Sequence, residues 1–87
     1  MITWTHLATE ETCDPDFRFR GPNNRQNYTC EVHIELSNGV RDVGIGHAWS
    51  WGFSAEAEAA ARRRAWANLY KEVLPRLSKC YGRLRQE

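Results

Sequence analysis

Cysteine and histidine are the side chains of this sequence with the chemistry to bind a metal or act as nucleophiles. They are spread along the chain, at Cys13, Cys30, Cys80, His6, His33 and His47. Cys30 and His33 are close in sequence, but residues three apart in a strand point to opposite faces. No neighbourhood resembles a nucleophile elbow or an oxyanion hole. We therefore predict no metal ion, no cofactor, no catalytic residue and a protein that is not an enzyme.

The cysteine pattern also bears on the compartment. Three cysteines, an odd number without a Cys-x-x-Cys pair, argue against a disulfide framework and predict free thiols in a reducing environment. No apolar run approaches the roughly 18 residues of a membrane span, and residues 1–4 lack the basic and apolar order of a signal peptide. We expect a cytoplasmic protein without membrane contact.

Charged residues gather in the segment after Ser54, where Ser54 is a natural N-cap and alanines predict a helix to about Leu74. Glu56 and Glu58 are about 200° apart around such a helix, so they suit the helix dipole and not a paired-carboxylate site. Residues 62–64 are all arginine and point in three directions. Arg63 is a candidate partner-binding residue, and the alternative is a set of solvated bases on the helix flank.

Aromatic residues follow a predicted strand at Trp49, Trp51 and Phe53. In the predicted register, the odd-numbered positions of this strand face the core, which places Trp49 there. Trp51 and Phe53 lie beyond the end of the alternating strand. Two interpretations stay open. All three close the core, or Trp51 and Phe53 form an exposed aromatic anchor of the kind enriched in protein interfaces.

The elements that position these residues begin with a hairpin. Residues 28–36 alternate strictly between apolar and polar and end at Asn38-Gly39, the dipeptide typical of a two-residue type I′ turn. That turn predicts the following cross-strand pairs: Ile34 with Val43, Val32 with Ile45, Cys30 with His47, and Tyr28 with Trp49. Gly44 and Gly46 then lie on the other face, opposite His33 and Glu31. The same register sets Glu35 against Asp42, a like-charge pair that it does not explain.

The remaining segments are read from turns and helix periodicity. Residues 16–20 predict a short edge strand before the turn at Gly21-Pro22, and residues 3–12 favour a short helix over a strand containing Ile2 and Trp4. The predicted core stripe of the last helix contains Ala55, Ala59, Trp66, Leu69, Tyr70, Val73 and Leu77. Residues 57, 61 and 65 form a second, alanine face. Pro75 should end or kink this helix, and residues 76–81 can form a further turn or two before a basic tail, within a basic extension over 75–87.

Length and composition agree with one small α+β domain. The chain of 87 residues has room for a single core and a body over about residues 5–74. We expect a three-stranded antiparallel sheet packed on one long C-terminal helix. Ten of the twelve basic residues are arginine and the net charge is +1, so overall charge does not argue for non-specific nucleic-acid binding.

This order of elements resembles the double-stranded RNA-binding domain. The residues that carry the resemblance are Phe17, Gly21-Pro22, Tyr28-x-Cys30-x-Val32, Gly44-x-Gly46, and the alanine-rich helix from Ser54 to Ala65. They cover roughly residues 5–72. The family implies a fold with a first helix, three strands and a last helix. It also implies that duplex RNA contacts the first helix, the loop after Gly-Pro, and basic residues at the start of the last helix.

The sequence departs from that family where RNA would be held. Residues 55–58 read Ala-Glu-Ala-Glu in place of the family's lysine cluster, and two carboxylates at a helix N-terminus repel phosphate. The family's loop histidine is also missing, with Asn23, Asn24 and Arg25 standing nearby. These differences shift the expected partner from duplex RNA toward protein.

Two functional hypotheses follow. The first is a protein-interaction module or inhibitor that acts on a host protein or ribonucleoprotein complex through Trp51, Phe53, Arg63, Asn23, Asn24 and Arg25. Small non-enzymatic domains of this length are also typical of viral inhibitors such as the phage-encoded anti-CRISPR proteins, an analogy of size without a shared motif. A homodimer is a variant. The alternative is binding of double-stranded RNA through Asn23, Asn24, Arg25, Arg63 and Lys71.

Overall fold

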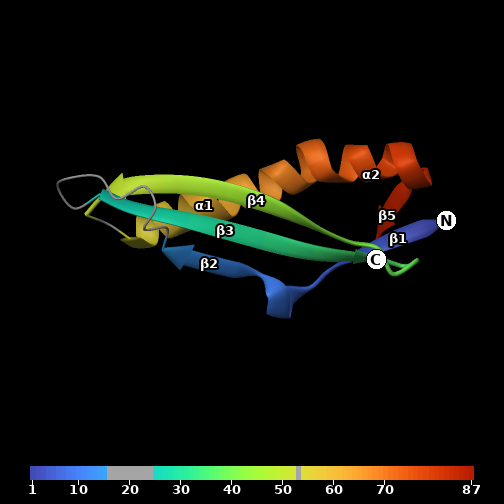
Figure 1. Ribbon diagram of the computed structural model, residues 1–87, viewed down its shortest axis with the longest axis horizontal. Coiled ribbons are helices and arrows are strands. Elements are labelled where there is room, and N and C mark those ends of the chain that lie inside the picture. The colour runs from blue at the N-terminus through green and yellow to red at the C-terminus, as the bar shows by residue number, and fades with distance from the viewer. Residues whose placement is uncertain (16–24, 53) are drawn as a thin grey trace.

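One long helical segment packs against one face of a mixed β-sheet (Figure 1). The structure is a computed structural model that describes residues 1–15, 25–52 and 54–87. Its elements, in chain order, are β1 (Ile2–His6), a 3-10 turn (Ala8–Glu10), β2 (Thr12–Pro15), β3 (Arg25–Leu36), β4 (Arg41–Trp51), α1 (Ser54–Asn68), a π-helical turn (Leu69–Val73), α2 (Leu74–Tyr81) and β5 (Leu84–Gln86). The α+β class and the long C-terminal helix are confirmed.

The sheet is built around β3, which has partners on both sides. Along one side it pairs antiparallel with β4 over nearly its whole length. The other side is shared by β2, opposite residues 28–31, and β1, opposite residues 34–36. β5 then pairs parallel with β1. The described sheet therefore has five strands and mixed direction, in place of the three antiparallel strands predicted.

The N-terminal segment is extended, so the predicted helix over residues 3–12 is wrong. Ile2, Trp4 and His6 alternate along β1, and Trp4 is buried against the helix layer with 3% of its surface exposed. Burial of this large indole favours a strand, because a strand directs every second side chain to one face. The predicted edge strand over 16–20 and the Gly21-Pro22 turn lie outside the described residues.

The hairpin between β3 and β4 has a three-residue loop, Ser37–Gly39. The Leu36 N–H donates to the Val40 carbonyl at 2.7 Å, and the Gly39 N–H donates to the Leu36 carbonyl at 2.9 Å. Gly39 has φ +91°, the left-handed conformation that follows a type I turn in three-residue hairpins. The predicted two-residue loop is therefore wrong by one residue.

This single residue exchanges the two faces of β4. Val32 lies opposite Gly44, Cys30 opposite Gly46, and Glu35 opposite Arg41. Because side chains alternate along a strand, the glycines now face the helix, and residues 43, 45, 47, 49 and 51 face away from it. The like-charge pair of the predicted register is replaced by an Arg41–Glu35 ion pair at 3.4 Å.

The glycines of β4 let the helix approach the sheet closely. A Cβ on Gly46 would lie 2.2 Å from the Ala65 nitrogen and 2.3 Å from the Ala61 oxygen, and a Cβ on Gly44 would lie 2.6 Å from the Ala65 oxygen. Ala57, Ala61 and Ala65 are fully buried. The alanine face of the helix is therefore the one that contacts the sheet.

Only part of the predicted helical core stripe is buried. Leu69, Val73 and Leu77 continue the alanine row at four-residue steps and join the core, as predicted. Ala55 and Ala59 are exposed, Trp66 is half-buried, and Tyr70 is 50% exposed. Trp66 and Tyr70 stack on each other at the flank of the helix.

Pro75 does not end the helix, which continues to Tyr81 and stops at Gly82 with φ +83°. The turn before it is π-helical, and the Leu74 N–H donates to the Leu69 carbonyl five residues earlier. A widened turn relieves the clash of a proline ring with the preceding turn. Residues 75–87 are consequently part of the body, since Leu77 is buried and β5 extends the sheet.

The register makes a direct prediction for Gly46→Ala. The added methyl has no room against the backbone of α1, so we expect the free energy of unfolding to fall by about 3 kcal/mol. The control is His47→Ala on the opposite face, where we expect a change of at most about 1 kcal/mol. Urea denaturation measures both. If Gly46→Ala were as stable as the wild type, Gly46 would have to lie on the face that points away from α1, and the observed register would be wrong.

Candidate functional site

The sheet face opposite α1, here called the outer face, is the most distinctive surface of the described residues. Every second residue of β4 contributes to it, and three large apolar side chains stay accessible there: Ile45 is 41%, Trp49 46% and Trp51 52% exposed. Neighbouring β3 contributes polar side chains in place of a second apolar row. The result is a narrow aromatic strip along β4 beside a polar strand.

Trp49 and Trp51 form a contacting pair at one end of that strip. Their ring centroids are 5.2 Å apart and the rings meet edge to face at 80°. The prediction that Trp49 lies on the core face is wrong, because the shift in register turns it outward. Trp51 is exposed, as the aromatic-anchor interpretation requires, and Phe53 lies outside the described residues. The exposed aromatic pair of the described residues is thus Trp49 with Trp51.

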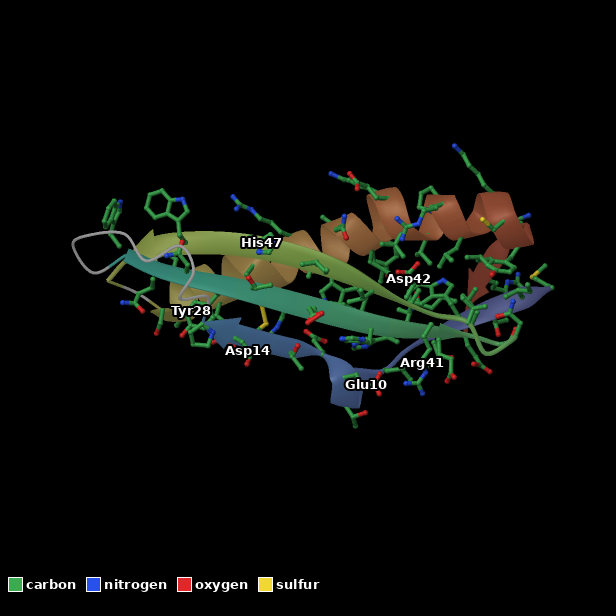
Figure 2. All side chains as sticks on the ribbon, viewed as in Figure 1. Glu10, Asp14, Tyr28, Arg41, Asp42 and His47 are labelled. Carbon is green, nitrogen blue, oxygen red and sulfur yellow. A yellow bond between two sulfur atoms is a disulfide. The ribbon has the colours of Figure 1, made fainter. Side chains whose placement is uncertain are left out.

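The polar strand beside the tryptophans is set by the β3–β4 register. Asn27 lies opposite Trp49, Thr29 opposite His47, and Glu31 opposite Ile45. Thr29 Oγ1 and His47 Nδ1 share a hydrogen bond of 2.9 Å across the strands. On the far side of β3, Asp14 of β2 lies opposite Thr29, and Figure 2 marks Asp14 and His47 on their strands.

Two side chains of α1 hold the outer edge of β4. Arg64 donates from Nη1 to the His47 carbonyl at 2.7 Å, and Asn68 Oδ1 accepts from the Ile45 N–H at 3.0 Å. These contacts cover backbone groups that an edge strand would otherwise leave open to pairing. They fix the part of β4 that leads to the tryptophan pair.

The three consecutive arginines do have separate surroundings. Arg62 reaches toward β2, Arg64 reaches the edge of β4, and Arg63 is exposed on the helix. Of the predicted binding residues whose side chains are described, Trp51 lies on the outer face and Arg63 on the helix, so these two do not share one site. Asn23 and Asn24 lie outside the described residues, and of Arg25 only the backbone, paired with Trp51, is described.

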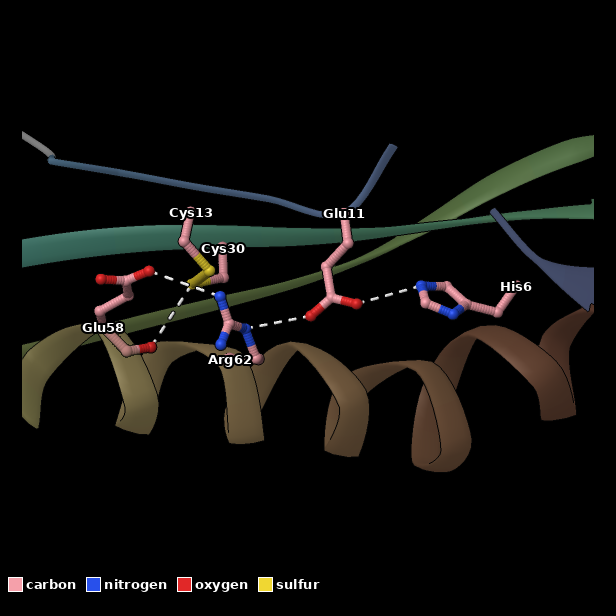
Figure 3. Close-up of polar contacts among 6 residues, drawn as sticks. All are labelled: His6, Glu11, Cys13, Cys30, Glu58 and Arg62. Atoms are coloured by element: carbon pink, nitrogen blue, oxygen red, sulfur yellow. Dashed lines mark hydrogen bonds and ion pairs between the residues drawn. A yellow bond between two sulfur atoms is a disulfide. The ribbon is translucent and has the colours of Figure 1, made fainter. Parts of the chain in front are cut away.

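A second cluster of reactive residue types lies between the sheet and α1 (Figure 3). Glu11 lies at its centre, with Oε1 3.0 Å from Arg62 Nε and Oε2 3.1 Å from His6 Nε2. The contact with His6 does not have the geometry of a hydrogen bond. Arg62 also pairs with Glu58 at 3.4 Å. The His6 ring packs edge-on against Trp66 at 4.6 Å. These contacts tie the N-terminal segment to the helix.

Cys13 and Cys30 are joined in a disulfide beside this cluster, so the prediction of three free thiols is wrong for both. The pairing of β2 with β3 sets the two residues directly opposite each other. Cys30 is fully buried, and its sulfur lies 3.6 Å from the Glu58 carbonyl oxygen. Cys80 is free, as predicted, and it is exposed. The argument from free thiols for a reducing compartment therefore fails.

Comparison with known proteins gives the surface no precedent. No family model, no curated protein and no solved structure matches the chain. Among the described residues, no helix is long and apolar enough to cross a membrane. The interpretation of the outer face consequently depends on its own side chains.

The disulfide predicts the thiol count and the stability of cysteine variants. Protein purified without reductant and then unfolded should show one reactive thiol per chain, from Cys80, and reduction should raise the count to three. We expect the double variant Cys13→Ser, Cys30→Ser to lose about 3 kcal/mol of unfolding free energy, because the bond closes a loop of moderate length. Cys80→Ser is the matched control and should change stability by at most about 0.5 kcal/mol. Three thiols before reduction would contradict the bond.

Proposed function

We propose that this protein is a non-enzymatic macromolecule-binding module that engages a protein, or the protein part of a ribonucleoprotein complex, through the outer face. The observation that supports the proposal best is the exposed Trp49–Trp51 pair. Both indoles lie on a regular strand whose edge is held by Arg64 and Asn68. A rigid aromatic pair loses little conformational entropy when a partner covers it.

The tryptophan pair has the energetic character of an interface anchor. Tryptophan is enriched among the few residues that dominate binding free energy, and each such residue contributes about 2 kcal/mol or more when a partner buries it. About half of each side chain is accessible, at 46% and 52%. Such accessible apolar area is available for burial by a partner.

The charges near the helix start favour a protein over duplex RNA. Glu56 is exposed in the first turn of α1, where a phosphate would otherwise be attracted by the helix dipole. Of the neighbouring bases, Arg62 and Arg64 are engaged in contacts within the fold. The segment that should supply the first RNA-binding helix is extended. These features support a fold that shares the hairpin and last helix of the double-stranded RNA-binding domain without its RNA contacts.

Inhibition of a host complex, including the phage-encoded anti-CRISPR type, is the form of this proposal that suits a small binding domain. A cytoplasmic location stays a prediction, since the Cys13–Cys30 disulfide removes the argument that supported it. Homodimerisation also stays a prediction.

The proposal predicts the behaviour of Trp49→Ala combined with Trp51→Ala. We expect the double variant to bind the native partner about 100-fold more weakly, with little loss of stability, because both side chains are half exposed. Affinity capture from the native host with quantitative mass spectrometry identifies the partner and compares the variants. Tyr81→Ala is the control, since Tyr81 is 40% exposed on α2, toward the other end of the molecule.

Binding of duplex RNA is the result that would contradict the proposal. A fluorescence titration with an RNA of about 16 base pairs at two salt concentrations tests it, since phosphate contacts weaken steeply as salt rises. Micromolar or tighter, salt-sensitive binding that survives loss of both tryptophans would replace the proposal by RNA binding.

A further inference from the structure

We propose that the partner presents a basic, extended segment to the outer face, with its cationic side chains at Asp14 and Glu31 and over the indoles of Trp49 and Trp51. This inference rests on the proposed function and adds the chemistry of the partner. It is carried by the aromatic pair together with the distribution of charge around it.

The described part of the outer face over β2, β3 and β4 is acidic once internal ion pairs are taken into account. Among the described side chains that these three strands contribute to the face, Arg41 is the cation, and it is already paired with Glu35 at 3.4 Å and Glu10 at 3.2 Å. Arg85 of β5 lies beside Thr3, at the end of the sheet away from the tryptophans. Glu31 is 39% exposed and lies 3.9 Å from His33 Nε2, a group that is charged only when protonated. Asp14 is exposed, and no ion pair joins it to another described residue. Two carboxylates are left for an external cation.

The carboxylates and the indoles are close enough for one segment to reach both. Asp14 lies opposite Thr29, and Thr29 lies opposite His47, two residues before Trp49. With strands about 4.8 Å apart and a rise of about 3.3 Å per residue, Asp14 and Trp49 are about 12 Å apart along the sheet surface. An extended chain covers that distance in about four residues. A basic residue and a second contact residue about four positions apart therefore fit this surface.

Tryptophan and carboxylate favour the same kind of partner group. A guanidinium or ammonium placed over an indole face gains a cation–π interaction, and the aliphatic part of the same side chain covers apolar area. The nearby carboxylates attract the same cation. A phosphate backbone, in contrast, would meet Asp14 and Glu31 as like charges, so nucleic acid is disfavoured on this face.

The test uses two fluorescein-labelled synthetic peptides, one of alternating arginine and valine and one with glutamate in place of each arginine. Fluorescence anisotropy measures the binding of each to the folded protein. We expect the arginine peptide to bind and the glutamate peptide not to bind. Asp14→Asn with Glu31→Gln should weaken arginine-peptide binding about 10-fold, equal to about 1.4 kcal/mol, and the Trp49→Ala, Trp51→Ala variant should weaken it by a similar factor.

The matched control is Glu56→Gln with Glu72→Gln, which neutralises two exposed carboxylates of the helix. Each glutamine keeps an oxygen that can accept the hydrogen bond now donated by Ser50 Oγ or Asn68 Nδ2, so β4 should stay in place. We expect less than about a 2-fold change, because neither carboxylate belongs to the outer face and salt screens exposed charges. Equal losses in the two charge variants would show non-specific attraction and overturn the inference. So would equal binding of the two peptides to the wild-type protein.

The native partner separates this inference from the proposed function. If the tryptophan variant releases the captured partner and the Asp14→Asn, Glu31→Gln variant retains it fully, the interaction surface stands and its charge preference is overturned. If neither variant releases the partner, both proposals fail. Sedimentation velocity tests whether a second copy of this chain binds the outer face instead. A dimer that these same substitutions dissociate would replace the basic segment by that second copy.

Discussion

The close approach of α1 to β4 is the constraint on which the rest of the fold depends. Gly44 and Gly46 present bare backbone to Ala61 and Ala65, and no side chain larger than hydrogen fits at either glycine. Such contact gains dispersion energy from many atoms at short range. It also fixes which face of β4 is inside, and thereby which face carries Trp49 and Trp51. The exposed aromatic pair is a consequence of how the helix sits.

The hairpin shows how much local pattern can predict and where it stops. Alternation located the inner face of β3 correctly, because Cys30, Val32, Ile34 and Leu36 are all buried. It assigned β4 to the wrong parity, because Val43, Ile45 and Trp49 are apolar on the side that stays accessible. The like-charge pair of Glu35 with Asp42 was the sign of the error, and moving the register by one residue sets Glu35 against Arg41. Electrostatic fit across the strands was a better guide to register than apolar character.

Other features depend on contacts between distant segments. Ser54 was recognisable as the start of the helix because caps and alanines act locally. The pairing of β2 with β3, which sets Cys13 opposite Cys30, has no local signal while residues 3–12 are read as a helix. The helix that continues past Pro75 likewise leads to contacts with distant segments, since Leu77 joins the core and β5 pairs with β1. For the candidate site, the sequence left Trp51 open between the core and an exposed anchor and assigned Trp49 to the core. Both tryptophans are exposed, because the register decides which face they occupy.

The parallel pairing of β5 with β1 links folding to the order of synthesis. Ile2 lies beside Leu84, and the strands come together at the end of the molecule where the N-terminus is seen (Figure 1). Closing so long a loop is entropically costly, so we expect this contact to form after the hairpin and helix are in place. On the ribosome β5 emerges after every other described element. Until then β1 has an open edge on that side, and a nascent chain paused at this stage would be the form most exposed to strand pairing with a neighbouring chain.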